Sequence, residues 1–304
     1  MIRAGVLVLL LAGPAGAEGL CDAAWEKVLA GLVSFGTVSG TVGQEGDWCV
    51  VQGVILDLDG QYLPDWHADR LRMRGSALGW LVEGAGAPDG LEIGVEGLRL
   101  VVQTGNPQMD WLFAAQARPN AIRAETSLSW DAAARELRLE GLSIDFPGEN
   151  LVELSAVVAG VDLSSTGAAQ MSATSFALTE FDARITTHGL FEWYVLMALG
   201  PSMLPYEGDM DAAAEGLRAE MRAAVADLPG NSFPDASKAA LGALIDELPN
   251  PSGDLTVSLR SEAGFGPSRL MPWAMTGVPR TVSEAAGVLD GVTVEVGWTH
   301  ADAP

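Results

Sequence analysis

LRLEGLSI, at residues 137–144, places its apolar side chains at odd positions before the glycine and at even positions after it. The side chains of a β-strand alternate between the two faces of a sheet, so this change of phase would expose the buried face unless the backbone bends. Glycine allows such a bend, because it tolerates a positive φ and often marks a β-bulge. The segment therefore predicts a strand that bulges or turns at Gly141 and then continues.

The same pattern occurs twice more, in LEIGVEGLRL at residues 91–100 and in CVVQGVIL at residues 49–56. Successive glycines of the three segments, Gly53, Gly97 and Gly141, are 44 residues apart. A regular period of this length is typical of a supersecondary unit repeated along an array. Three units are too few for a propeller, so the repeat favours an open, twisted antiparallel sheet. A chance match between short segments of a glycine-rich chain is the alternative interpretation.

The remaining chain predicts further strands and then helices. Residues 151–163 are apolar on both faces, and residues 168–187 are interpreted as one or two strands with a phase slip near Thr179. The later elements that we expect are a short apolar helix at 190–199, helices at 209–228 and 235–248 that form an αα-hairpin, strands at 254–259 and 292–296, and a short helix at 283–289.

Together these elements predict a fold that is α+β and mostly β. We expect an extended twisted antiparallel sheet of repeated strand units, with a C-terminal αα-hairpin packed on it. Residues 18–188 would form a β-rich repeat body with an N-terminal helix. Residues 189–304, with the helical hairpin and the returning strands, would belong to the same domain.

The first 17 residues have the pattern of a cleaved signal peptide. Arg3 precedes a short apolar run, and small residues ending at Ala17 offer a cleavage site. Cys21 and Cys49 are the two cysteines of the chain, and in an oxidising compartment we expect them to form a disulfide that pins a helix at 22–33 to a strand beginning near Asp47. A reactive or metal-binding cysteine pair is the alternative, although no histidine lies nearby in sequence.

The acidic composition excludes one large class of partners. The chain has a formal net charge of −23, which becomes about −24 when Arg3 is removed with the leader. A protein this acidic repels the phosphate backbone of nucleic acids and the surfaces of anionic lipids. Beyond the leader, no apolar run approaches the length of a transmembrane helix. We therefore expect no nucleic-acid partner and no membrane span after cleavage.

Motifs for catalysis are missing from the sequence. It lacks a nucleophile elbow and a phosphate-binding glycine loop, so we assign no catalytic residue and no cofactor. The best metal candidates are Asp57, Asp59, Asp65, His67 and Asp69, but they do not follow the spacing of a calcium loop. A structural interpretation is simpler, because Asp57 and Asp59 share one face of a predicted strand, and we assign no metal site.

Arg70, Arg72 and Arg74 form a basic stripe on one face of a predicted strand. One interpretation makes the stripe a ligand site for a carboxylate or a phosphate headgroup. The other places it opposite Asp57 and Asp59 across a hairpin, as a ladder of cross-strand ion pairs. The order strand, loop 60–67, strand favours the ladder.

WDAAARELRLEGLSIDFPGENLVELSAVVAGVDL (130–163) resembles the stranded body of AsmA-like envelope proteins. LTEFDARITTHGLFEWYV (178–195), followed by a helical hairpin, is similar to uncharacterised periplasmic families of that type. The resemblance implies a periplasmic β-rich body with one face able to shelter lipid or another protein. Such proteins usually carry a membrane anchor, whereas here a cleavable leader is expected.

Two functions from different classes remain. The first is a non-enzymatic periplasmic envelope protein whose curved sheet binds lipid, another apolar ligand or a protein partner. The second is a periplasmic metal- or carboxylate-dependent hydrolase that uses Asp57, Asp59 and Asp65 with His67. A purely structural scaffold is not separable from the first by sequence.

Overall fold

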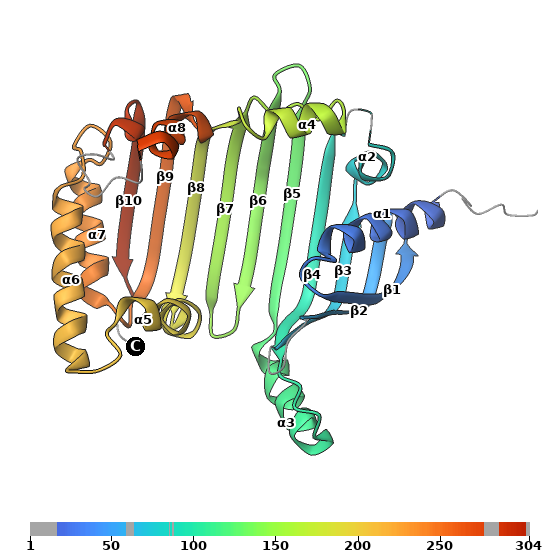
Figure 1. The fold of residues 1–304 in the computed structure, drawn as a ribbon, viewed down its shortest axis with the longest axis horizontal. Helices are drawn as coiled ribbons and strands as arrows, with labels where there is room; N and C mark the ends of the chain where they lie inside the picture. Colours follow the sequence, from blue (N-terminus) through green and yellow to red (C-terminus); the bar gives the residue numbers. More distant parts are fainter. Residues whose placement is uncertain (1–16, 59–63, 85, 87, 277–285, 302–304) are drawn as a thin grey trace, which may run out of the picture.

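The computed structural model describes residues 17–58, 64–84, 86, 88–276 and 286–301. In this part of the chain, ten strands form one antiparallel sheet in which each strand pairs with its neighbours in sequence (Figure 1). The strands are β1 (Thr37–Glu45), β2 (Trp48–Asp57), β3 (Asp65–Arg74), β4 (Gly90–Val101), β5 (Ile122–Asp131), β6 (Glu136–Phe146), β7 (Asn150–Ala159), β8 (Ala177–His188), β9 (Ser252–Phe265) and β10 (Val292–His300). The predicted class, α+β and mostly β, is confirmed.

The helices lie at the two ends of the sheet and along its upper and lower edges (Figure 1). They are α1 (Ala17–Leu32), α2 (Ala77–Glu83), α3 (Pro107–Ala117), α4 (Thr166–Ser172), α5 (Met197–Met203), α6 (Met210–Ala226), α7 (Asp235–Glu247) and α8 (Pro267–Thr276), with the short helices η1 (Arg118–Asn120), η2 (Phe191–Leu196, a π-helix) and η3 (Ala286–Leu289). The helix α1 lies beside β1 and β2, and α6 and α7 lie beside β10. All even-numbered strands end at the lower edge, so α3 and η2–α5 both leave the sheet there.

A β-bulge lies at each of the three repeat glycines. The pairing register shifts at Gly53 against β1, at Gly97 against β5, and at Gly141 against both β5 and β7. The extra residue in β6 keeps its leucines and Ile144 directly opposite the apolar residues of β7, which is the outcome that the phase change predicted. Gly53 and Gly97 have left-handed φ angles of 62° and 71°, whereas Gly141 forms its bulge without one.

The sequence predicts strands throughout residues 168–187, and the structure differs from this prediction at the start of the segment. The segment 166–172 forms α4, because the Ser165 side chain accepts a hydrogen bond from Ala168 N and caps the helix. The strand β8 follows, and its register shifts against β7 opposite Val157 and Val158, which confirms the phase slip near Thr179. The short helix that begins near 190 continues through Pro201 instead of ending at it. Of the predicted helix at 283–289, residues 286–289 are described, as η3.

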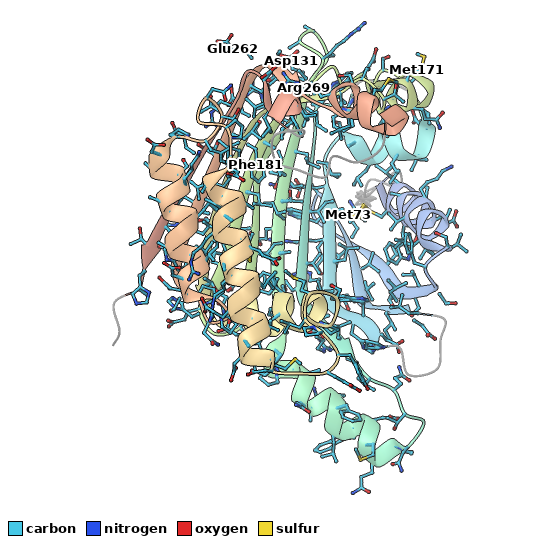
Figure 2. All side chains as sticks on the ribbon, turned by 60° about the vertical axis from the view of Figure 1, so that its left-hand side comes forward. Met73, Asp131, Met171, Phe181, Glu262 and Arg269 are labelled. Carbon is cyan, nitrogen blue, oxygen red and sulfur yellow. A yellow bond between two sulfur atoms is a disulfide. The ribbon has the colours of Figure 1, made fainter. Side chains whose placement is uncertain are left out.

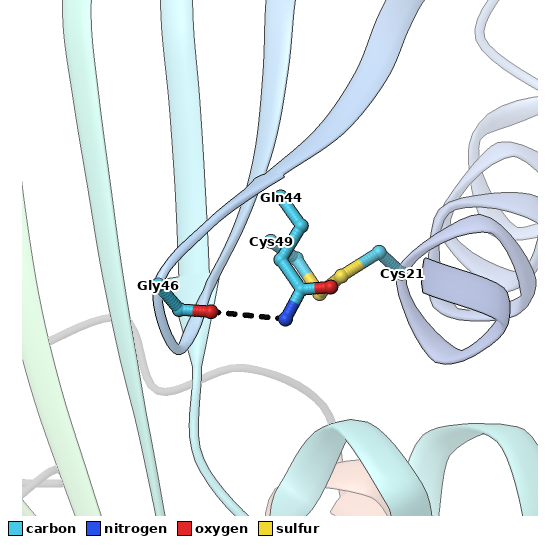
Figure 3. Close-up of a disulfide and its surroundings, with 4 residues drawn as sticks. All are labelled: Cys21, Gln44, Gly46 and Cys49. Carbon is cyan, nitrogen blue, oxygen red and sulfur yellow. Dashed lines mark hydrogen bonds between the residues drawn. A yellow bond between two sulfur atoms is a disulfide. The ribbon is translucent and has the colours of Figure 1, made fainter. Parts of the chain in front are cut away.

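A disulfide joins α1 to β2, as predicted. Cys21 and Cys49 are bonded, with their Cα atoms 5.2 Å apart (Figure 3). The bridge lies in a buried cluster that also contains Ala24, Met73 and Leu78. Beside it, Gln44 Nε2 donates to Gly46 O over 2.9 Å and braces the turn between β1 and β2. The N-terminal helix therefore shares a core with the first strands of the sheet.

The segment that contains α7 covers the outer edge of β10. Val294 N donates to Ser232 O (2.7 Å) and Val296 N donates to Ser237 Oγ (3.0 Å). An exposed strand edge is a template for pairing with other chains, and these contacts remove that hazard here. The ion pair between Arg222 and Asp246 (2.6 Å) joins α6 to α7.

Candidate functional site

The two faces of the sheet differ in chemistry from one end to the other. Directly opposed residues of an antiparallel sheet share a face, so the register defines rows that cross the strands. One such row, from β3 to β10, is Arg72, Gly94, Glu125, Ser143, Glu153, Arg184, Thr256 and Gly297. This row marks the polar face.

The opposite face carries a row of apolar side chains across all ten strands. One row on it, from β1 to β10, is Val42, Val51, Leu71, Val95, Ala124, Ile144, Val152, Ile185, Leu255 and Trp298. A parallel row, from β4 to β10, is Leu91, Leu128, Leu139, Ala156, Phe181, Leu259 and Val294. We call this side the apolar face.

Among the described residues, no helix covers the middle of the apolar face (Figure 1). No residue of β6 is buried, and Asn150 is the one buried residue of β7, although β6 carries leucine and isoleucine and β7 carries leucine and valine toward this face. Met73 on β3, near α1, and Phe181 on β8 lie on either side of this open part (Figure 2). A soluble protein rarely leaves a contiguous apolar sheet face partly exposed, so this region is a candidate binding surface.

A cavity of about 490 Å³ lies at the β8–β10 end of the apolar face. Its floor is formed by residues of β8, β9 and β10, among them Ile185 and Leu255, and its roof by η2, α6 and α7. The lining residues are Ile185, Thr187, Leu190, Phe191, Val195, Met221, Ala224, Val225, Leu241, Leu244, Ile245, Leu248, Pro251, Leu255 and Trp298. This volume is in the range of small-molecule sites, which are mostly apolar.

A second cavity, of about 310 Å³, lies near the other end of the same face, beneath α1 and α2. Met73, Leu91, Leu128 and Leu137 contribute to its floor, and Trp80 from α2 is part of its lining. Trp80 Nε1 is buried and has no hydrogen-bond partner in the described part of the chain. A buried indole N–H is normally bonded, so this donor is free for an oxygen of a bound molecule.

On the polar face, the predicted arginine stripe is held by carboxylates. Arg72 pairs with Glu125 (2.6 Å), Arg74 pairs with Glu92 (2.7 Å) and Asp47 (3.2 Å), and Arg70 pairs with Glu45. The guanidinium groups of Arg72 and Arg74 also stack on Trp48, at 4.7 and 4.4 Å from its ring centroid. These contacts favour the ion-pair interpretation of the stripe over a headgroup site.

The predicted partners of these arginines are wrong, however. In the β2–β3 hairpin, Val50 lies opposite Arg72 and Leu56 lies opposite Trp66, so the end of β2 faces the start of β3. Asp57 therefore lies far along the strand from the stripe, and Asp59 lies outside the described residues. An antiparallel hairpin dictates this arrangement, because pairing proceeds outward from its loop.

The candidate hydrolase and metal residues do not form a centre in the described structure. Asp69 pairs with Arg99 (2.8 Å), and Asp65 is buried and accepts from Gln103 Nε2 (2.6 Å). Burial lowers the pKa of His67, and the positive charge of Arg99 lowers it further. No group of three metal-ligating side chains occurs among the described residues. Arg99, which the sequence analysis did not consider, thus neutralises one of the candidates.

No protein-family model matches the chain, and no curated protein matches it. The similarity to AsmA-like proteins therefore stays a prediction. The described part of the chain contains no helix that is long and apolar enough to cross a membrane.

Sequence reasoning anticipated a sheet with one apolar side but missed both cavities. The residues that form their roofs, such as Trp80 on α2 and Val225 on α6, come from helices far from their floors in sequence. The apolar pattern of 210–228 indicated a helix, but not the part of the sheet on which it packs. The larger cavity could have been anticipated from the sequential order of the strands, because that order places the last helices next to the last strands.

Proposed function

We propose that this protein is a non-enzymatic, exported carrier that binds the acyl chain of a lipid on its apolar face. One observation carries the proposal: the apolar face stays partly exposed across β6 and β7, between two roofed apolar cavities. The two cavities, of about 490 and 310 Å³, have the volumes of small-molecule sites, and a hydrocarbon chain suits their apolar lining. The proposal therefore commits to a lipid.

The dimensions of the open region suit an extended chain. Leu137, which lines the smaller cavity, pairs through Val158 with Leu178 on β8. Ile185, which lines the larger cavity, lies seven residues further along β8 than Leu178. At about 3.3 Å per residue this is roughly 23 Å. The hydrocarbon half of a bilayer, which one acyl chain spans, is roughly 15 Å thick. The two strand spacings between β6 and β8, about 4.8 Å each, lengthen the path to roughly 25 Å. One chain therefore covers somewhat more than half of the path between the cavities.

The free indole N–H of Trp80 supplies a polar anchor. An ester or carboxylate oxygen at the end of the chain would satisfy this donor in the smaller cavity. Export is part of the proposal, and the leader pattern and the Cys21–Cys49 disulfide support it, since structural disulfides persist in oxidising compartments.

The experiment combines extraction with titration. Lipid is extracted from the purified full-length chain and identified by mass spectrometry, and the delipidated protein is titrated with cis-parinaric acid, a fluorescent fatty acid. Leu255→Trp fills the larger cavity from its floor and should weaken binding by about tenfold or more, since one lost side-chain burial is worth at least ~1.4 kcal/mol. Trp80→Phe should weaken it by roughly two- to tenfold through the lost hydrogen bond.

Leu151→Trp is the matched control. Leu151 lines an open hollow of about 510 Å³ that Arg123, Glu125 and Asp145 also line, so the new indole has room outside the apolar face. This variant should bind the fatty acid as the unmodified chain does. If no lipid is extracted and cis-parinaric acid does not bind, or if Leu151→Trp weakens binding as much as Leu255→Trp, the proposal is wrong.

A further inference from the structure

Exposed tryptophan and tyrosine side chains gather at the lower edge of the sheet. Among the described residues, every exposed tryptophan and tyrosine lies there: Trp111 on α3, Trp193 and Tyr194 on η2, and Tyr206 after α5. Trp111, Trp193 and Tyr206 are 64%, 78% and 99% exposed. Tryptophan and tyrosine concentrate at the membrane–water interface, where an apolar ring and a polar tip are both accommodated.

The helix α3 projects from this edge and packs on little else. It has no buried residue, and Met109 and Leu112 are exposed beside Trp111. Its single acidic residue, Asp110, lies in the first turn and accepts hydrogen bonds from Thr104 N (2.7 Å) and Thr104 Oγ1 (2.8 Å). An apolar helix that a soluble protein leaves uncovered indicates a partner surface.

The charge of the molecule restricts what this partner can be. With a formal net charge of −23, two copies of the chain repel each other, and anionic lipid surfaces repel the chain as well. The tip of α3 has no compensating cluster of basic residues that would attract an acidic partner. Trp111, Trp193 and Tyr206 line none of the cavities described above, so they suit a fluid surface better than a partner that inserts an anchor residue.

We propose that α3 and the η2–α5 segment form a docking surface for a net-neutral, zwitterionic lipid bilayer. The aromatic rings and Leu112 enter the interfacial layer, while the acidic body stays in water. Both segments follow even-numbered strands and leave the same edge, so one plane can contact both. Its exposed rings line neither apolar cavity, although η2 also contributes Phe191 and Val195 to the roof of the larger one, and the surface does not depend on the proposed carrier function.

Vesicle flotation tests the proposal. The full-length chain should float with phosphatidylcholine vesicles, and less of it should float when phosphatidylglycerol is added. The double substitution Trp111→Ser and Leu112→Ser should reduce the partition coefficient roughly tenfold or more, because two large apolar contacts are lost. Met171→Ser is the control, since Met171 is 73% exposed on α4 at the opposite edge and should leave flotation unchanged (Figure 2).

A second measurement avoids any change in folding. Trp111→Phe keeps the apolar contact, so it should float normally but show less quenching of its tryptophan emission by brominated phosphatidylcholine. The proposal is wrong if the chain does not float with phosphatidylcholine vesicles or floats only when phosphatidylglycerol is present. It is also wrong if Met171→Ser lowers the partition coefficient as much as the double substitution does. If sedimentation velocity shows that the chain is a dimer and that the double substitution makes it monomeric, the surface binds a second copy of the chain instead. Fatty-acid binding should be unchanged in every variant, which separates this test from that of the carrier function.

Discussion

Asp69 lies in register between two of the bulge glycines. By the pairing of β3, it faces Gly53 on one side and Gly97 on the other. Its carboxylate accepts from Arg99 Nη1, which also donates to Gly97 O (2.6 Å). A Cβ atom on Gly97 would come within 2.1 Å of Asp69 Oδ2. The glycine therefore permits both the left-handed backbone of the bulge and the close approach of the carboxylate.

Gly97→Ala should lower the free energy of unfolding by about 1–3 kcal/mol, from the strain of a left-handed alanine together with displacement of Asp69. Gly141→Ala is the matched control, because Gly141 has an ordinary φ and open space at its Cβ position. It should change stability by no more than about 0.5 kcal/mol. Urea unfolding of both variants measures the difference, and equal losses would contradict this account of the bulges.

At the scale of elements, one carboxylate joins the end of α7 to β10. Glu247 accepts from Trp298 Nε1 (2.7 Å) and lies 2.9 Å from His300 Nδ1. Burial acts to raise the pKa of Glu247, but the hydrogen bonds from Trp298 and His300 outweigh it and hold the pKa below its ordinary value of 4.5. A carboxyl group with a lowered pKa in the folded state stabilises that state above its ordinary pKa.

The stabilisation by Glu247 is therefore present at neutral pH and is lost as the pH falls below about 4.5 and through the folded-state pKa. Glu247→Gln should lower the free energy of unfolding by about 1–2 kcal/mol at pH ~7, and this deficit should shrink in acid. Denaturant unfolding at neutral and acidic pH measures it. Glu262→Gln, at an exposed position of β9, controls for the removal of one negative charge. A deficit that stays constant with pH would contradict the assignment.

The elements that were predictable from sequence are those with a local signal. The phase change at Gly141 indicated its bulge, and Asp209 marks the start of α6 because its side chain accepts from Ala212 N. The helix α3 was not predicted, because its apolar residues do not form a single stripe, although Asn106 before Pro107 is a capping signal. The partners of Arg72 were missed because Glu125 is 53 residues away and register across several strands is not local.

At the scale of the whole molecule, the two edges of the sheet are unlike. Ser232 and Ser237 are buried and bind the outer N–H groups of β10, whereas no hydrogen bond to the outer edge of β1 is found in the described part of the chain. Every residue of β1 is exposed or partly exposed. The C-terminal edge is therefore closed, and the N-terminal edge relies on the polar side chains of β1.

Ser237→Ala should leave Val296 N–H buried without a partner and lower the free energy of unfolding by about 1–2 kcal/mol. Hydrogen exchange provides an internal control. The Val296 amide should exchange faster in the variant, while the Val294 amide, which donates to the backbone oxygen of Ser232, should keep its protection. Equal acceleration of the two amides would show instead that the whole α7 segment detaches.

The sequential strand order also has a consequence for how the chain acquires its structure. Most strands meet their next partner within a few dozen residues, and β8 is the exception, because residues 189–251 separate it from β9. A polypeptide that emerges N-terminus first can form the sheet one hairpin at a time, starting from the end that carries the disulfide. The addition of strands ends at β10, because Ser232 and Ser237 accept hydrogen bonds from its outer N–H groups. Such a scaffold also lengthens or shortens by whole hairpins without rearranging those already laid down.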